Sequence, residues 1–230
     1  MITLQTLYHD LCNLLNPRFC GICDSRLNPS EQKLCAKCLM RLPYLFIENY
    51  YDNDVSRLFW GRIPVERAYS HFRYLHDSEA HHFMVMLKYK HRPDLGVWMG
   101  AVVARELLSQ DFFDGIDCII PVPLHWRRYL TRGYNQSTQI ARGIAKVTGL
   151  PLLKRHVRRI RNNETQTHKT SSERFQNVEN LFRVRQKIPY SHVLLVDDVL
   201  TTGATLTSCA QAILDRYPTM RISILTLAKA

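Results

Sequence analysis

The chain is predicted to be an α/β protein, with a mostly parallel sheet flanked by helices and a small N-terminal cysteine-rich element. Three observations predict this class. Apolar, strand-like runs alternate with segments of helical periodicity between residues 68 and 227. The run from Val193 to Val196 leads directly into two acids, a threonine-rich loop and a helical period. Two closely spaced cysteine pairs lie within residues 20–38. The alternation indicates a sheet covered on both faces, with its ligand at the carboxyl ends of the strands.

The individual elements follow from local patterns. Residues 3–15 have the spacing of an amphipathic helix, and Ser78 is a suitable N-cap for the next one. Residues 161–180 are polar and loop-like, with a capping box at Thr170 and Glu173. Gly149 is a stop signal for a helix that begins near Asn135. Strands are expected at 68–74, 116–122, 152–160, 180–184, 193–196 and 222–227, and further helices at 97–109 and 206–214.

Length and composition limit the possible classes. The 230 residues are 46% hydrophobic and 22% charged, which allows one sizeable core and a small annex. We therefore expect a helix and cysteine element over residues 1–50 and the main domain over 51–230. No apolar run approaches the roughly 20 residues of a membrane span, and no signal peptide is evident, so we expect a cytoplasmic protein. The net charge of +11 favours phosphate-rich partners, although a generic basic surface would give the same charge.

The run from Val193 to Leu206 is the most informative segment. A loop of threonines and a glycine at the start of a helix suits a phosphate, because hydroxyls and free backbone N–H groups meet there. Asp197 and Asp198 would repel that phosphate, and they suit vicinal hydroxyls or Mg²⁺ instead. A phosphorylated sugar carries both a phosphate and vicinal hydroxyls, so it would suit the whole segment. The alternative is an ordinary strand–turn–helix with a polar turn.

A second segment, from Ile119 to Gln136, also points to phosphate. Its strand ends in Pro-x-Pro, and Arg127, Arg128 and Arg132 follow within six residues, ahead of the helix expected from Asn135. Guanidinium groups bind phosphate oxygens in bidentate pairs, so the segment suits a pyrophosphate. The alternative is a solvated basic turn.

Both segments resemble known signatures. The run from Leu194 to Thr205 resembles the phosphoribosyl-pyrophosphate (PRPP) signature of type I phosphoribosyltransferases. Pro-Val-Pro-Leu-His at 121–125 and Arg-Gly-Tyr-Asn-Gln at 132–136 are similar to the ComF/GntX-like competence family, which joins such a domain to an N-terminal four-cysteine zinc element. The resemblance covers nearly the whole chain and is weakest at residues 45–65.

The resemblance also implies roles for particular residues. Asp197 and Asp198 would hold the ribose hydroxyls, and the following loop would hold the 5′-phosphate. The segment around 165–177 resembles the mobile loop of the family, with spacing that departs locally. The PRPP-binding residues implied are Asp197, Asp198, Val199, Thr201, Thr202, Gly203, Ala204, Thr205, Arg127, Arg128 and Arg132, and the loop residues are Gln166, Arg174 and Asn177.

Four cysteines predict a structural metal site. Cys20 and Cys23 form one Cys-x2-Cys pair, and Cys35 and Cys38 form the second. Four thiolates around one Zn²⁺ make a closed tetrahedral site. A disulfide pair, a redox site and an iron–sulfur cluster remain as alternatives. The isolated cysteines at 12, 118 and 209 lie on apolar faces and are interpreted as small buried hydrophobes.

Two functions are compatible with these features. The first is a protein that binds PRPP and handles incoming single-stranded DNA during natural transformation, beside an ATP-driven DNA translocase, as the family resemblance implies. The basic run at 154–161 and the aromatic residues Trp126, Tyr129 and Tyr134 among arginines support it.

The second function is an active phosphoribosyltransferase of nucleotide or cofactor metabolism, using Mg²⁺ and PRPP with an unidentified nitrogen acceptor. Arg127 and Arg128 would then stabilise the leaving pyrophosphate, while Asp197 and Asp198 orient the ribose. No segment of the sequence identifies that acceptor, and whether transfer is catalysed at all stays open.

Overall fold

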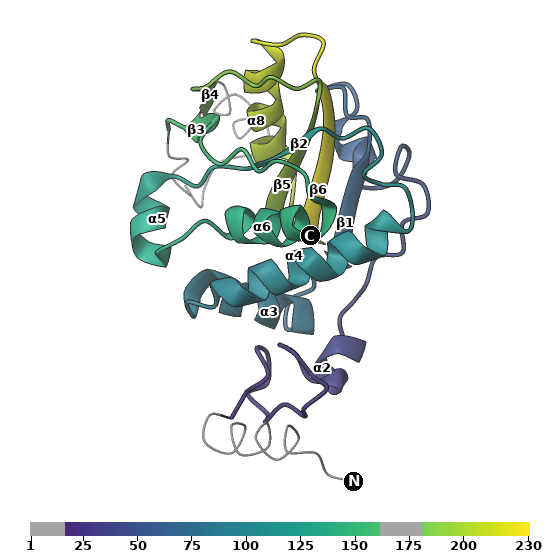
Figure 1. Ribbon diagram of the computed structural model, residues 1–230, viewed down its shortest axis with the longest axis vertical. Coiled ribbons are helices and arrows are strands. Elements are labelled where there is room, and N and C mark those ends of the chain that lie inside the picture. Colours follow the sequence, from purple (N-terminus) through teal and green to yellow (C-terminus); the bar gives the residue numbers. More distant parts are fainter. Residues whose placement is uncertain (1–16, 162–180) are drawn as a thin grey trace.

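The computed structural model describes residues 17–161 and 181–230, and its centre is a four-stranded parallel sheet. The strand order is β1-β6-β5-β2 (Figure 1). The bounds are Ala68–Arg73 for β1, Cys118–Pro121 for β2, His192–Leu200 for β5 and Arg221–Lys229 for β6. All three pairings are parallel, as the alternation of strands and helices predicts.

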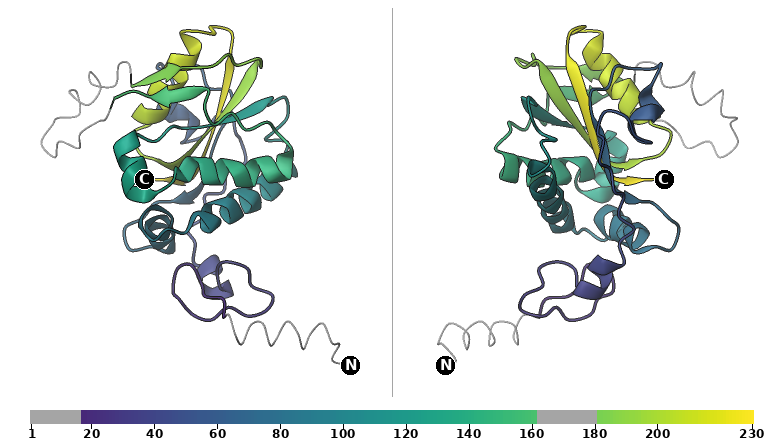
Figure 2. Two further views of the ribbon diagram at one scale, coloured as in Figure 1. Left: turned by 60° about the vertical axis from the view of Figure 1, so that its left-hand side comes forward. Right: turned by 90° about the vertical axis from the view of Figure 1, so that its right-hand side faces the viewer.

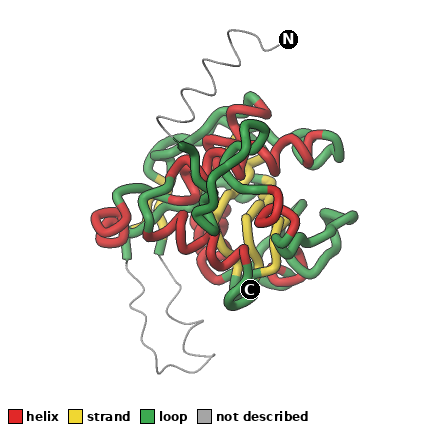
Figure 3. Tube along the Cα trace, turned by 90° about the horizontal axis from the view of Figure 1, so that it is seen from below, coloured by secondary structure: helices red, strands yellow, loops and turns green. Residues whose placement is uncertain are grey.

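Helices cover both faces of this sheet, and each face has its own apolar core. One core joins Leu194 and Val196 of β5 to α3 (Glu79–Tyr89), α4 (Pro93–Leu108) and α6 (Gln136–Thr148). The other joins Val193 and Leu195 to α8 (Ala204–Leu214) and the 3₁₀ helix η1 (Ser56–Phe59). Figure 3 shows the strands in the interior with helices and loops around them. Alternate β5 side chains therefore belong to opposite cores, as in a fully buried strand.

The expected helix stops and caps are present. Ser78 caps α3 by accepting a hydrogen bond from the His81 backbone N–H at 3.3 Å. Gly149 ends α6 with φ of 75°, the left-handed conformation that glycine adopts at low cost. Cys118 and Cys209 are fully buried, as predicted. The helix expected at 3–15, the capping box at 170–173 and Cys12 lie outside the described residues.

Two segments differ from the prediction. The strand expected over 152–160 is divided: Leu152 makes one bridge to Ile119 in the parallel sheet, while β3 (Val157–Arg159) pairs antiparallel with β4 (Phe182–Val184) in a separate ribbon. The segment 126–132 is a helix, α5 (Trp126–Arg132), although no helix was expected there from the sequence. The helix forms because the His125 imidazole caps its N-terminus, accepting from the Arg127 N–H at 3.4 Å, and because Gly133 ends it with φ of 74°.

The four-cysteine segment, with the short helix α2 (Ala36–Met40), lies at the end of the molecule beyond α3 (Figure 2). It packs on α4 through several contacts. Lys33 pairs with Asp94 at 2.8 Å, and the Trp98 indole N–H donates to the Gln32 side chain at 2.8 Å. Leu27, Leu34 and Leu42 belong to the same apolar core as α4. The segment therefore has no separate core of its own among the described residues.

Candidate functional site

Asp197 and Asp198 lie within β5, not in the loop after it. β5 continues past the acids because its backbone stays paired with β6, as in the register Val199 to Ala228. Asp197 Oδ1 accepts hydrogen bonds from the Ser137 hydroxyl at 2.8 Å and from the Asp198 N–H at 2.9 Å. Asp198 pairs with Lys88 of α3, with 3.2 Å between Nζ and Oδ2. The two carboxylates are thus oriented by residues from α6 and α3.

Burial, and next the neighbouring charge of Asp198, raise the pKa of Asp197 to about 7. The Ser137 hydroxyl and the more distant charge of Lys88 act against this rise. Two adjacent acids at such a position are costly unless cations or hydroxyl donors compensate them, and Lys88 and Ser137 each supply one such partner. Ser137 and Lys88 were missed by the sequence analysis, because each lies far from the acids in the chain and neither belongs to a recognisable pattern.

The threonine loop joins β5 to α8 and presents free backbone donors. Gly203 has φ of 77°, and no side chain caps the N-terminus of α8. The first helical bond is donated by the Thr207 N–H to the Gly203 carbonyl at 2.8 Å. The preceding N–H groups of the first turn therefore remain available to an anion. Thr201 and Thr202 are exposed, and Arg62 donates to the Thr202 carbonyl at 3.0 Å.

The loop also packs closely against the 3₁₀ helix η1. A Cβ added to Gly203 would lie 3.1 Å from the ring of Phe59, so the loop closely approaches a fully buried aromatic side chain. Together with its positive φ, this contact leaves room only for glycine at position 203. Phe59 of η1 therefore limits the side chain at position 203, and it lies in the residue range where the sequence resemblance is weakest.

β2 lies next to β5 in the sheet, and α5 follows β2 in the chain. A group of cations surrounds the start of α5. Desolvation, and next the charges of Arg159, Arg127 and Arg128, lower the pKa of His125. Burial and next Arg128 lower the pKa of Arg159, whereas Asp197 raises it. Arg127, Arg128 and Arg159 therefore all act on His125, and Arg159 also interacts with Asp197. Arg159, from β3, was not singled out from the sequence, since it lies in an ordinary alternating basic run.

Arg132 contacts a different part of the molecule from Arg127 and Arg128. Its guanidinium lies 5.2 Å from the centre of the Tyr89 ring and donates to the Gln136 side chain at 3.0 Å. Tyr134 is also turned inward, because its hydroxyl donates to the Leu87 carbonyl. The loop residues Gln166, Arg174 and Asn177 lie outside the described residues.

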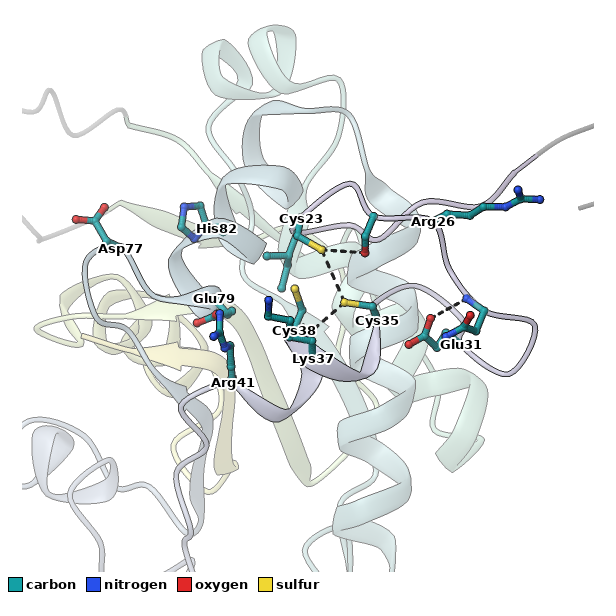
Figure 4. A pocket seen from close by; sticks show the side chains of 13 residues that line it. Cys23, Arg26, Glu31, Cys35, Lys37, Cys38, Arg41, Asp77, Glu79 and His82 are labelled. Atoms are coloured by element: carbon teal, nitrogen blue, oxygen red, sulfur yellow. Dashed lines mark hydrogen bonds and ion pairs between the residues drawn. The ribbon is translucent and has the colours of Figure 1, made fainter. Parts of the chain in front are cut away.

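The four cysteines are brought together as the spacing predicts (Figure 4). Their sulfur atoms all lie within 4.8 Å of one another, and those of Cys23 and Cys35 are 3.7 Å apart. Four sulfurs about 2.3 Å from a tetrahedral Zn²⁺ would be separated by about 3.8 Å. All four thiols are free, so no disulfide joins them. The arrangement fits a tetrahedral metal ion.

The electrostatics of the cluster agree with this fit. Desolvation raises the pKa of Cys20 and of Cys38, whereas the Ser25 hydroxyl and N–H lower the pKa of Cys23 to about 6. Buried thiols of this kind do not ionise readily without a nearby cation. A bound metal ion would supply that charge. The cluster borders a cavity of about 720 Å³ that reaches Glu79 and His82 of α3 (Figure 4).

Comparison with known proteins agrees with the geometry. A phosphoribosyl transferase domain model matches residues 130–230, which include the acids and the threonine loop. Competence protein F of Haemophilus influenzae is 28% identical over 223 residues, covering 92% of this chain and 85% of that protein. The DNA utilization protein YhgH of Shigella flexneri is 31% identical over 198 residues, covering 85% and 83%. The chain belongs to the ComF-like family of phosphoribosyltransferase-domain proteins.

A further ComF-like relative, competence protein ComFC of Bacillus subtilis, is 30% identical over 113 residues, which are 49% of this chain and 44% of that protein. These matches confirm the family expected from the sequence. None of the helices in the described ranges is both long enough and apolar enough to cross a bilayer.

Proposed function

We propose that this ComF-like protein binds PRPP with Mg²⁺ at the carboxyl ends of β2 and β5. The observation that carries the proposal is the combination, at one edge of the sheet, of two acids, an uncapped helix N-terminus and a group of arginines. Each part suits a different portion of PRPP. The helix end suits the 5′-phosphate, the acids suit the ribose hydroxyls, and the arginines suit the pyrophosphate.

Different residues would then bind the 5′-phosphate, the ribose and the pyrophosphate. Thr201, Thr202 and the N–H groups of Ala204 and Thr205 would bind the 5′-phosphate, with Gly203 allowing close approach. Asp197 and Asp198 would accept from the ribose hydroxyls and hold Mg²⁺ through water. Arg127, Arg128 and Arg159 would stabilise negative charge on the pyrophosphate. Lys88 would release Asp198 when the ligand occupies the site.

We further propose that the protein handles incoming single-stranded DNA during natural transformation, beside an ATP-driven translocase, in the cytoplasm where PRPP and reduced thiols are available. The names of the relatives and the net charge of +11 support this role. An internal sugar of DNA is a poor ligand for the two acids, because it has no 2′-hydroxyl and its 3′-oxygen carries a phosphate that carboxylates repel. Free PRPP is therefore the better occupant of the acid site, and DNA needs another surface.

The alternative function, an active phosphoribosyltransferase, uses the same residues. Its specific support is the group formed by Arg127, Arg128 and Arg159, whose charges would stabilise a leaving pyrophosphate. The four-cysteine cluster takes no part in either reaction and is proposed to hold one structural Zn²⁺.

The test is a calorimetric titration of the protein with Mg·PRPP, followed by an assay of pyrophosphate release. Asp198→Asn is expected to weaken PRPP binding at least tenfold, whereas the control Asp215→Asn, at an exposed position on α8's C-cap, should leave it unchanged. Equal affinities of the wild type and Asp198→Asn would reject the site. Pyrophosphate release without an added acceptor would show hydrolysis, and release that depends on an amine would support the transferase.

A further inference from the structure

Helix α5 presents an apolar face to solvent. None of its residues is buried, and the exposed fractions are 56% for Trp126, 52% for Tyr129 and 73% for Leu130. These positions are spaced i, i+3 and i+4, so they share one face of the helix. Such a face is normally packed against another element. Nothing in the described part of the chain covers it.

Arginines flank this face on both sides. The Arg127 guanidinium lies 5.5 Å from the centre of the Trp126 ring, and that of Arg132 lies 5.2 Å from the ring of Tyr89. Tyr89 is 60% exposed and ends α3. One ring–arginine contact therefore lies at the start of α5, and a second connects the end of α5 to the end of α3. Tyr134, which the sequence analysis included among these aromatic residues, is half-buried and is not part of this surface.

The junction between the two helices is well fixed. The Tyr134 hydroxyl donates to the Leu87 carbonyl, and a Cβ added to Gly133 would lie 3.8 Å from the His91 ring. The end of α5 is thus held beside the end of α3, so Tyr89 and Tyr129 are carried on elements whose relative position is set by packing. A fixed set of rings binds a ligand at a lower entropic cost than rings on a free loop.

The two-stranded ribbon of β3 and β4 is basic, and it lies on the same side of the molecule as α5 (Figure 1). Arg158 of β3 and Arg183 of β4 are direct partners in the antiparallel register, and both are exposed. Like charges in opposite positions destabilise a strand pair unless an anion is present. In the ranges that the structure describes, no carboxylate forms an ion pair with either of them. Arg159, which ends β3 of this ribbon, is close enough to Arg128 of α5 for their charges to interact.

We propose that the exposed face of α5, together with Tyr89, is a stacking surface for the bases of single-stranded nucleic acid, with the flanking arginines binding its phosphates. The proposal rests on the DNA-handling role proposed above and gives that role a surface separate from the acid site. Exposed rings beside arginines suit unpaired bases, whose faces are accessible, whereas the faces of a duplex are already stacked. An acidic protein would use the arginines but not the rings.

The experiment measures binding of a fluorescent 20-nucleotide oligo-dT and of an abasic strand of the same length. The double variant Trp126→Ala/Tyr129→Ala should bind oligo-dT at least tenfold more weakly, since each stacked base contributes about 1–3 kcal/mol. Trp126→Phe/Tyr129→Phe keeps two rings and should retain most of the affinity. The matched control Phe46→Ala/Trp60→Ala removes exposed rings from elsewhere and should bind like the wild type.

Two further measurements distinguish binding by base stacking from binding by charge. The abasic strand should bind the wild type and the double alanine variant equally, because it has phosphates but no bases. The alanine variant should also keep the wild-type slope of affinity against salt concentration, since no phosphate contact has been removed. Equal binding of oligo-dT and abasic strand by the wild type would overturn the proposal, as would an equal loss in the Phe46/Trp60 control.

The remaining outcomes identify which proposal has failed. If the wild type binds PRPP but no oligo-dT, the DNA role fails and the stacking surface fails with it. If it binds oligo-dT and the double alanine variant binds equally well, only the stacking surface is overturned. Binding of anionic vesicles that is lost in the alanine variant, without any change in oligo-dT affinity, would make the face a membrane contact and would likewise overturn the proposal.

Discussion

Replacing Asp197 with asparagine should stabilise the fold while it removes ligand binding. The carboxylate is held partly buried beside Asp198, and its pKa is raised from 3.8 to about 7. The folded protein therefore binds the Asp197 proton more tightly than the unfolded chain does. Between about pH 4 and pH 7 the folded state holds more protons, so the free energy of unfolding falls as the pH rises.

The size of the effect follows from the shift. Each unit of pKa corresponds to about 1.4 kcal/mol, so ionised Asp197 costs about 4 kcal/mol at pH 8 and about 1 to 2 kcal/mol at pH 5. Asparagine has no charge and keeps an oxygen for the Ser137 hydroxyl, but its new NH₂ group loses about 1–3 kcal/mol if no partner is found. The net gain should be about 1 to 3 kcal/mol at pH 8 and close to zero at pH 5.

The assay is thermal unfolding of the wild type and Asp197→Asn at both pH values. For a chain of this length, 1 kcal/mol corresponds to about 2–4 °C, so the midpoint should rise by several degrees at pH 8. Asp215→Asn serves as the control, because Asp215 is exposed and its replacement should change little at either pH. A lower midpoint for Asp197→Asn at pH 8, or an equal gain at both pH values, would refute the reasoning.

Two further predictions concern packing and metal. Gly143→Ala should lower the free energy of unfolding, measured in urea, by more than about 3 kcal/mol. The added Cβ would overlap the Val97 carbonyl oxygen and lie 2.7 Å from the Ala101 nitrogen. Gly96→Ala should lower it less, because the nearest neighbours of its added Cβ are side-chain atoms at 3.0 Å. A similar loss in both would contradict the close approach of α4 and α6. Metal analysis should find about one Zn²⁺ per chain in the wild type and less in Cys35→Ser, whereas Cys118→Ser should keep it. A folded wild type with four reactive thiols and no metal would rule the site out.

Local pattern was sufficient for the parts of the site that are continuous in the chain. The strand, acids, threonine loop and helix around Asp197 follow one another directly, so their chemistry could be read in order. The cysteine cluster was predictable because its spacing matches metal geometry. Gly149 ended α6 as expected, since a glycine stop acts through its own backbone.

The partners of the acids could not be predicted, because tertiary packing supplies them. Ser137 reaches Asp197 across 60 residues, and neither it nor Lys88 lies in a distinctive pattern. The length of β5 depends on pairing with β6, so the acids stay in the strand although they are polar. Helix α5 was missed because its rings face solvent, and a segment without a buried face gives no apolar period to detect.

The order of strands in the sheet has a consequence for synthesis of the protein. β6 follows every other described strand in the chain, yet it lies between β1 and β5. Ala68 of β1 pairs with Ile224, so the edge of β1 has no strand partner until translation has passed residue 224. Contacts of such long sequence separation form slowly, and an unpaired apolar strand can pair with other chains. The nascent chain should therefore be most prone to aggregation, and most dependent on chaperones, just before β6 leaves the ribosome.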